Sequence, residues 1–102
     1  MFKLDPNPTF WVPVALSIPG STPVSIDVQF RHLDRDGLGR FFEGLKDRSD
    51  AESLAEIIVG WAKVDQPYSA EALDRLLRNY HTAAGELFAA YRKAMLESRT
   101  KN

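Results

Sequence analysis

The period of the apolar residues changes near residue 33, and this change decides what the chain can fold into. Between residues 10 and 30 apolar and polar side chains alternate, as in strands with one buried face. The alternating apolar positions form two runs, Phe10, Val12, Val14, Leu16 and Ile18, then Val24, Ile26, Val28 and Phe30. After residue 34 the apolar residues recur every three or four positions, as on one face of a helix. The sequence therefore predicts an α+β protein, with strands first and helices afterwards.

The two alternating runs predict an antiparallel β-hairpin, or a small antiparallel sheet, over residues 9–32. Turn-forming residues in "PGSTP" separate the runs by a loop length that is common in hairpins. Residues that face each other across the pair must point to the same side, so Trp11 is expected opposite Arg31 or Gln29. Pro13 has no N–H to donate, which makes the first strand an edge. So small a unit needs helices on its apolar face.

Four amphipathic helices are predicted after the hairpin. Their apolar stripes are Leu38, Phe41, Phe42 and Leu45; Leu54, Ile57, Ile58 and Trp61; Leu73, Leu76, Leu77 and Tyr80; and Ala84, Leu87, Phe88, Tyr91 and Met95. Ser49 begins a capping box with Glu52, and Ser69 and Thr82 are expected to cap the last two helices. The first helix is the weakest, because glycines lie within and beside it.

One domain of 102 residues is expected, since a chain of this length forms a single core. Its predicted parts are an extended lead-in over residues 1–8, the hairpin over 9–32, a helical body over 34–98 and a basic tail over 99–102.

The stretch "IVGWAKVDQPYSAEAL" (58–73) has two interpretations. As a joint between helices, Trp61 completes one apolar stripe, Pro67 prevents the helix from continuing, and Ser69 caps the next helix. As a binding loop, it presents Tyr68 to a partner. We favour the joint and expect Trp61 to be mostly buried.

Composition and motifs argue against an enzyme, a nucleic-acid-binding protein and a membrane protein. The formal net charge of −1 lacks the basic surplus that phosphate binding needs. The absence of cysteine excludes disulfides and thiolate metal sites. "DRDGLG" begins like a calcium loop, but leucines occupy later ligand positions. The first ten residues lack the apolar core of a secretory signal, and no window approaches the ~18 apolar residues of a membrane span. No catalytic residue, metal site or cofactor is predicted.

Residues on two further elements are candidate partner-binding residues. Trp11, Pro13 and Arg31 lie on the otherwise polar outer face of the predicted hairpin, and tryptophan is frequent among binding hot spots. The alternatives are that Trp11 stacks on Arg31 or is covered by the N-terminal segment. Phe41 and Phe42 would serve instead if the weak first helix moved aside, and packing in the core is their alternative.

Nearly the whole chain resembles the small tail assembly chaperones of tailed bacteriophages and prophages. The most specific parts are the lead "PNPTFWVPVALSIPG", the joint "VGWAKVDQPYS" and the final "KN". The glycine-rich "DRDGLGRFF" departs from the family pattern.

The resemblance implies a non-enzymatic protein that acts on the tape-measure protein, a very long apolar helical chain that sets tail length. Such chaperones coat this chain before tail-tube subunits polymerise around it, and help to recruit the major tail-tube protein. The implied location is the cytoplasm of the bacterial host, and the protein is not expected in the mature virion. Self-association is left open, and neither nucleic acid nor membrane is an expected partner.

The residues also leave a second class open, a small non-enzymatic adaptor or regulator that binds a folded protein. Such a protein would be antitoxin-like or related to transcription, with two of the short helices forming a helix-turn-helix. The third predicted helix argues against DNA recognition, because Glu71 and Asp74 offset the charges of Arg75 and Arg78.

Overall fold

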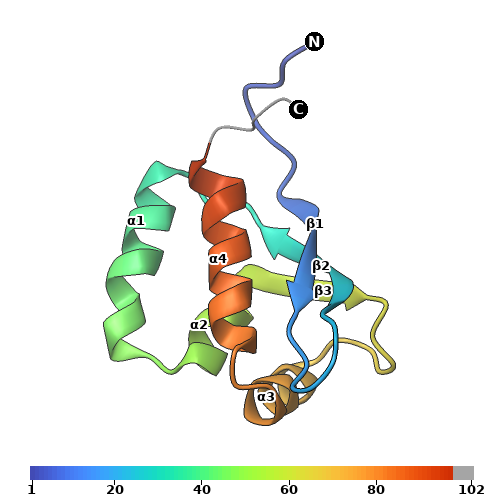
Figure 1. The fold of residues 1–102 in the computed structure, drawn as a ribbon. Coiled ribbons are helices and arrows are strands. Elements are labelled where there is room, and N and C mark those ends of the chain that lie inside the picture. The colour runs from blue at the N-terminus through green and yellow to red at the C-terminus, as the bar shows by residue number, and fades with distance from the viewer. Residues whose placement is uncertain (98–102) are drawn as a thin grey trace.

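The computed structural model describes residues 1–97 and places four helices against one face of a three-stranded antiparallel sheet (Figure 1). The elements are β1 (Thr9–Leu16), β2 (Val24–Arg31), α1 (Arg35–Gly44), a short 3-10 helix (Leu45–Asp47), α2 (Asp50–Ile57), β3 (Ile58–Ala62), α3 (Ala70–Asn79) and α4 (Ala83–Leu96). The predicted α+β class is confirmed. The basic tail predicted at 99–102 lies outside the described residues.

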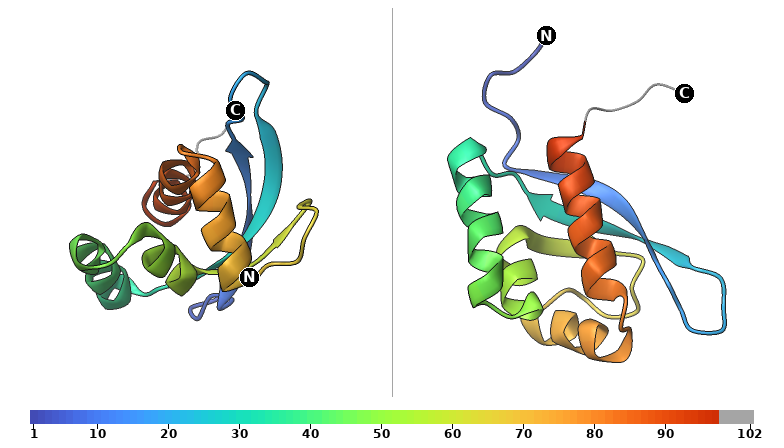
Figure 2. Two further views of the ribbon diagram at one scale, coloured as in Figure 1. Left: turned by 90° about the horizontal axis from the view of Figure 1, so that it is seen from below. Right: turned by 60° about the vertical axis from the view of Figure 1, so that its left-hand side comes forward.

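The hairpin forms in a register that the alternation allowed. Trp11 pairs with Gln29, Val12 with Val28, and Pro13 with Asp27. The even-numbered positions of both strands point toward the helices, and most of them are buried. Figure 2 shows the helices gathered on one side of the strands, so the opposite face of the sheet carries no helix within residues 1–97.

The prediction that the second helix continues to Trp61 is wrong. Helix α2 ends at Ile57, and the following residues form β3, in which Ile58 pairs with Phe30 and Trp61 with Val28 around a β-bulge. Two β-branched residues and a tryptophan favour a strand, and the open side of the hairpin offers it a partner. Gly60 faces Gln29, where a Cβ would come within 3.0 Å of the glutamine Oε1.

The core centres on an aromatic cluster that joins β1, β2, α1 and α4. The Tyr91 ring lies 5.1 Å from Phe30, 5.8 Å from Phe41 and 6.4 Å from Phe10, measured between ring centroids. The Tyr91 hydroxyl donates a hydrogen bond of 2.9 Å to the carbonyl of Arg31. Helix α4 therefore closes the core over the hairpin.

The helix starts follow the predicted capping residues in two of three cases. Ser49 and Glu52 form a complete capping box, and the Ser69 side chain accepts from the Ala72 amide. Thr82 stands at the start of α4 but makes no capping bond with its side chain, which corrects the prediction. Its backbone already has helical dihedral angles, whereas a capping side chain needs an extended backbone to reach the next amides.

Glu86, in the first turn of α4, ties this helix to the end of β1. Its carboxylate accepts from the Ser17 backbone amide, at 3.1 Å to Oε1, and from the Ser17 hydroxyl. Partial burial raises the pKa of Glu86, but hydrogen bonds from Ser17 and Thr82 outweigh this effect and hold the pKa below its ordinary value.

Glu86→Gln is expected to lower the free energy of unfolding at pH 7 by about 0.5–1 kcal/mol, after allowance for solvent screening. A lowered folded-state pKa stabilises the protein above the ordinary pKa and loses this contribution as pH falls through the folded value. The difference between wild type and variant should therefore fade from about pH 5 to pH 3. Denaturant titrations across this range measure it, with Glu43→Gln at an exposed position of α1 as the control. An equal difference at pH 3 and pH 7 would contradict the expectation.

Candidate functional site

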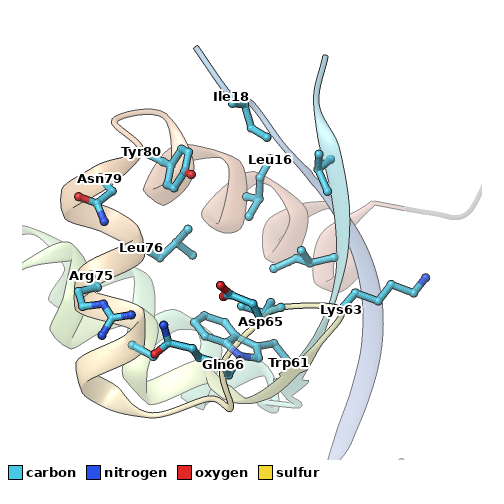
Figure 3. A pocket seen from close by; sticks show the side chains of 14 residues that line it. Leu16, Ile18, Trp61, Lys63, Asp65, Gln66, Arg75, Leu76, Asn79 and Tyr80 are labelled. Atoms are coloured by element: carbon cyan, nitrogen blue, oxygen red, sulfur yellow. Dashed lines mark hydrogen bonds between the residues drawn. The ribbon is translucent and has the colours of Figure 1, made fainter. Parts of the chain in front are cut away.

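A groove of about 440 Å³ lies between the loop end of the hairpin and α3. Figure 3 shows Leu16 and Ile18 on one side of it and Leu76 and Tyr80, from α3 and its end, on the other. Its apolar lining consists of Leu16, Ile18, Val24, Ile26, Trp61, Val64, Ala72, Leu76 and Tyr80, and its polar lining of Lys63, Asp65, Gln66, Arg75 and Asn79. The arrangement provides an apolar surface framed by polar groups.

The joint between β3 and α3 forms one wall of this groove. The Trp61 indole Nε1 donates a 2.8 Å hydrogen bond to the Gln66 carbonyl, and the Trp61 ring meets the Tyr68 ring edge-on at 5.1 Å. Lys63 has a φ of 68°, which turns the chain sharply after the strand. The segment is thus a joint folded back on Trp61, but it connects β3 to α3 rather than one helix to the next, which corrects that part of the prediction.

Trp61 and Tyr68 occupy different layers of this wall. Trp61 is partly buried and lines the groove from the inner face of β3, rather than from the helical stripe in which it was predicted. Tyr68 packs behind it, outside the groove lining, where burial raises the pKa of its hydroxyl. Tyr68 therefore supports the groove through Trp61.

Charges of both signs lie at the groove. Lys63 Nζ is 3.4 Å from Asp27 Oδ2 on the neighbouring strand, while Asp65 and Arg75 are exposed. A surface of this kind can accept a partner that carries both acidic and basic side chains beside an apolar stripe.

The outer face of the sheet presents Trp11, whose exposed fraction is 54%. Pro13 and Ala15, on the same face of β1, are also exposed. Phe2 and Leu4 have exposed fractions of 89% and 91%, so the N-terminal segment does not cover Trp11. The Arg31 guanidinium turns to α2, where its Nε donates a 3.1 Å bond to the Glu56 carbonyl.

Phe41 and Phe42 differ in their burial and in their contacts. Phe41 is 3% exposed within the aromatic cluster around Tyr91, which agrees with the core alternative. Phe42 is partly buried, and the guanidinium carbon of Arg92 lies 4.6 Å from its ring centre. The structure thus brings Trp11 and Pro13 together and places Phe41, Phe42 and Tyr68 elsewhere.

Sequence reasoning missed the groove, because its lining comes from three segments that are distant along the chain. A signal was nevertheless present around the hairpin loop. Ile18 and Val24 continue the apolar alternation as far as the turn, beyond the part of the hairpin that helices must cover for stability. Both residues line the groove.

Within residues 1–97, no cluster of three or more His, Cys, Asp or Glu side chains could hold a metal ion. None of the helices in this same part of the chain has the length and apolarity required to cross a membrane.

The chain has the features of a small α+β protein-binding domain: a sheet with one face free of helices in the described residues, an exposed tryptophan and an apolar groove. The sequence model of the family described as phage tail assembly chaperone matches residues 1–102, and the chain belongs to this family. Searches of curated proteins and of solved structures found no match. Family membership supports a chaperone role in tail assembly and the binding of phage tail proteins. The alternative of an antitoxin-like or transcription-related regulator receives no support from this match.

Proposed function

We propose that the groove binds apolar helical segments of the tape-measure protein and keeps that chain soluble until the tail tube forms. The observation that carries the proposal is the apolar lining between the hairpin and α3. Its volume of about 440 Å³ falls within the range of pockets that bury most of a small ligand. An amphipathic helix can lay its apolar side chains into such a groove while its polar face remains in water.

The charged residues at the groove suit a client with many similar segments. Asp65 and Arg75 offer contacts of either sign without demanding one sequence. A single groove of this size gives moderate affinity, but many copies on one long client give a stable and still reversible coat. Tail-tube subunits can then replace the chaperone one copy at a time as they polymerise, which is how we propose that it assists their recruitment.

The proposed activity is binding alone. It involves no bond making or breaking and no cofactor, and it takes place in the cytoplasm of the bacterial host before the virion is complete. The chaperone leaves the client as the tube closes and is therefore absent from the mature virion.

Ile18→Asp is expected to weaken the complex with the tape-measure protein at least tenfold, because it places a charge in the apolar lining without a partner. Ile18 lies outside the main core cluster, so the variant should fold. Co-expression followed by measurement of soluble tape-measure protein, and pull-down of the complex, provide the readouts.

Thr22→Asp is the matched control, because it adds the same charge at an exposed position of the same loop, away from the groove lining. The control should keep the tape-measure protein soluble. If a folded Ile18→Asp variant retains as much tape-measure protein as the control, the groove is not the client site. If wild-type protein neither binds nor solubilises the client, the proposed function itself is wrong.

A further inference from the structure

The free side of β1 is the largest unpaired backbone surface of the sheet. The strand order is β1-β2-β3, and within residues 1–97 nothing pairs with the other side of β1. The carbonyl of Pro8 accepts a 2.8 Å bond from the His32 amide, so even-numbered residues direct their backbone groups toward β2. The odd-numbered residues Thr9, Trp11, Pro13 and Ala15 therefore direct theirs to the free side.

This edge carries little of the usual protection against pairing. Natural edge strands carry charged side chains, prolines, bulges or covering segments, and of these β1 has only Pro13. The β1 sequence TFWVPVAL contains no charged residue, and its eight residues pair with β2 without a register shift. Pro13 removes one donor from the free side, but the amides of Thr9, Trp11 and Ala15 remain there.

The outer face next to this edge is apolar as well. Trp11 is 54% exposed, and Pro13 and Ala15 are exposed beside it. On β2 the same face is polar, with Ser25, Asp27 and Gln29 opposite these residues. The apolar strip thus runs along β1 and stops at β2. Such a strip would be buried if another strand paired with the free side of β1.

We propose that β1 pairs antiparallel with β1 of a second copy of this chain, on a two-fold axis that passes beside Val12. In this register Trp11 faces Pro13 of the second copy, Thr9 faces Ala15, and the overlap covers the strand from residue 9 to residue 15. Each proline removes one backbone bond from the pair that it shares with Trp11, and the Thr9–Ala15 pairs are complete. The indole then covers the proline ring of the other copy on the outer face.

A second copy fits this edge better than the tape-measure client. Strand addition requires an extended partner, whereas the proposed client is helical. A two-fold pair places the same patch against itself, and here the patch carries no charge to repel its copy. The net charge of −1 per copy adds little repulsion between the two domains. The inference does not depend on the groove, which lies on the helical side of the sheet.

Sedimentation equilibrium of the wild-type protein is expected to show a monomer–dimer equilibrium. Trp11→Lys should raise the dimer dissociation constant at least 30-fold, which corresponds to the loss of about 2 kcal/mol, because it removes the anchor and places a lysine on the edge. Ser25→Lys is the matched control, since it adds the same charge to the same face one strand away. The control should dimerise as the wild type does. At a protein concentration where the wild type is monomeric, both variants should unfold at the wild-type denaturant midpoint.

Cysteine cross-linking tests the register without background, because the chain contains no cysteine. Val12→Cys should form a disulfide between two copies, since facing residues without mutual hydrogen bonds have Cα atoms about 4.5 Å apart. Ser25→Cys should not cross-link. Failure of Val12→Cys to cross-link at concentrations where the dimer forms would overturn this register.

Other outcomes would overturn the pairing itself. A wild-type protein that stays monomeric at the highest soluble concentration contradicts it, and so does a dimer that Trp11→Lys does not weaken. If Trp11→Lys unfolds, Ala15→Lys on the same exposed edge serves in its place, because it adds the charge without changing the backbone donors, and it should also weaken the dimer. Ile18→Asp in the groove should leave the dimer intact, so the failure of one proposal is distinguishable from the failure of the other.

Discussion

Replacing Tyr91 by alanine is expected to lower the free energy of unfolding by about 4 kcal/mol, the largest effect of any single substitution that we describe. The side chain is fully buried and contacts three other aromatic rings from β1, β2 and α1. Truncation leaves a cavity at the centre of this cluster and also detaches α4 from the hairpin. Denaturant-induced unfolding followed by circular dichroism measures the change. A loss below about 1 kcal/mol would show that α4 does not close the core.

Tyr91→Phe separates the hydroxyl from the ring. The ring contacts remain, but the Arg31 carbonyl loses its 2.9 Å bond, and the expected loss is about 1–2 kcal/mol. Burial raises the pKa of Tyr91 to about 12. The stability that the Tyr91 hydroxyl contributes is therefore complete below the ordinary tyrosine pKa and declines as pH rises from there to the folded-state pKa. The stability difference between wild type and Tyr91→Phe should accordingly shrink between about pH 10 and pH 12.

Trp61→Ala is expected to reduce both stability and client binding. The free energy of unfolding should fall by about 3 kcal/mol, near the lower limit for tryptophan truncation because Trp61 is only partly buried. Binding of the tape-measure protein should weaken beyond this effect, since the same side chain forms the wall of the groove and holds the joint through the Gln66 carbonyl. Denaturant titration, and pull-down under conditions where the variant is folded, provide the two measurements.

Trp61→Phe is the matched control for this position. It retains a ring against Tyr68 and loses the bond to the Gln66 carbonyl, for an expected loss of about 1 kcal/mol. An unchanged midpoint for Trp61→Ala would mean that the joint is held by other contacts. A folded Trp61→Ala protein that binds the client normally would place the client site away from the groove.

The hairpin and the helices were predictable, because each carries a hydrophobic period that only one regular structure satisfies. The alternation around Val12 and Val28 fixed which side of each strand is buried, and with it the exposure of Trp11. The spacing of Leu73 and Leu76 likewise marked the inner side of α3. In these segments local pattern and final packing agree.

Strand β3 could not be predicted in the same way, because Ile57, Ile58 and Trp61 fit a helical stripe as well as a short strand. The choice between the two depends on the free side of β2, which is a property of the assembled sheet. The groove escaped prediction for a related reason. Its sides come from the end of β1, the joint and α3, and only the folded chain brings Ile18 close to Leu76.

The position of Tyr91 has a consequence for the newly made chain on the ribosome. Tyr91 follows its hydrogen-bond partner Arg31 by 60 residues. At roughly 5–20 residues per second, translation therefore separates the finished hairpin from its covering helix by about 3–12 s. During this interval the rings of Phe10 and Phe30, which lie beside each other on the inner side of the hairpin, lack the Tyr91 ring that packs against both. The nascent chain of this phage tail assembly chaperone thus exposes apolar surface of the kind that chaperones cover.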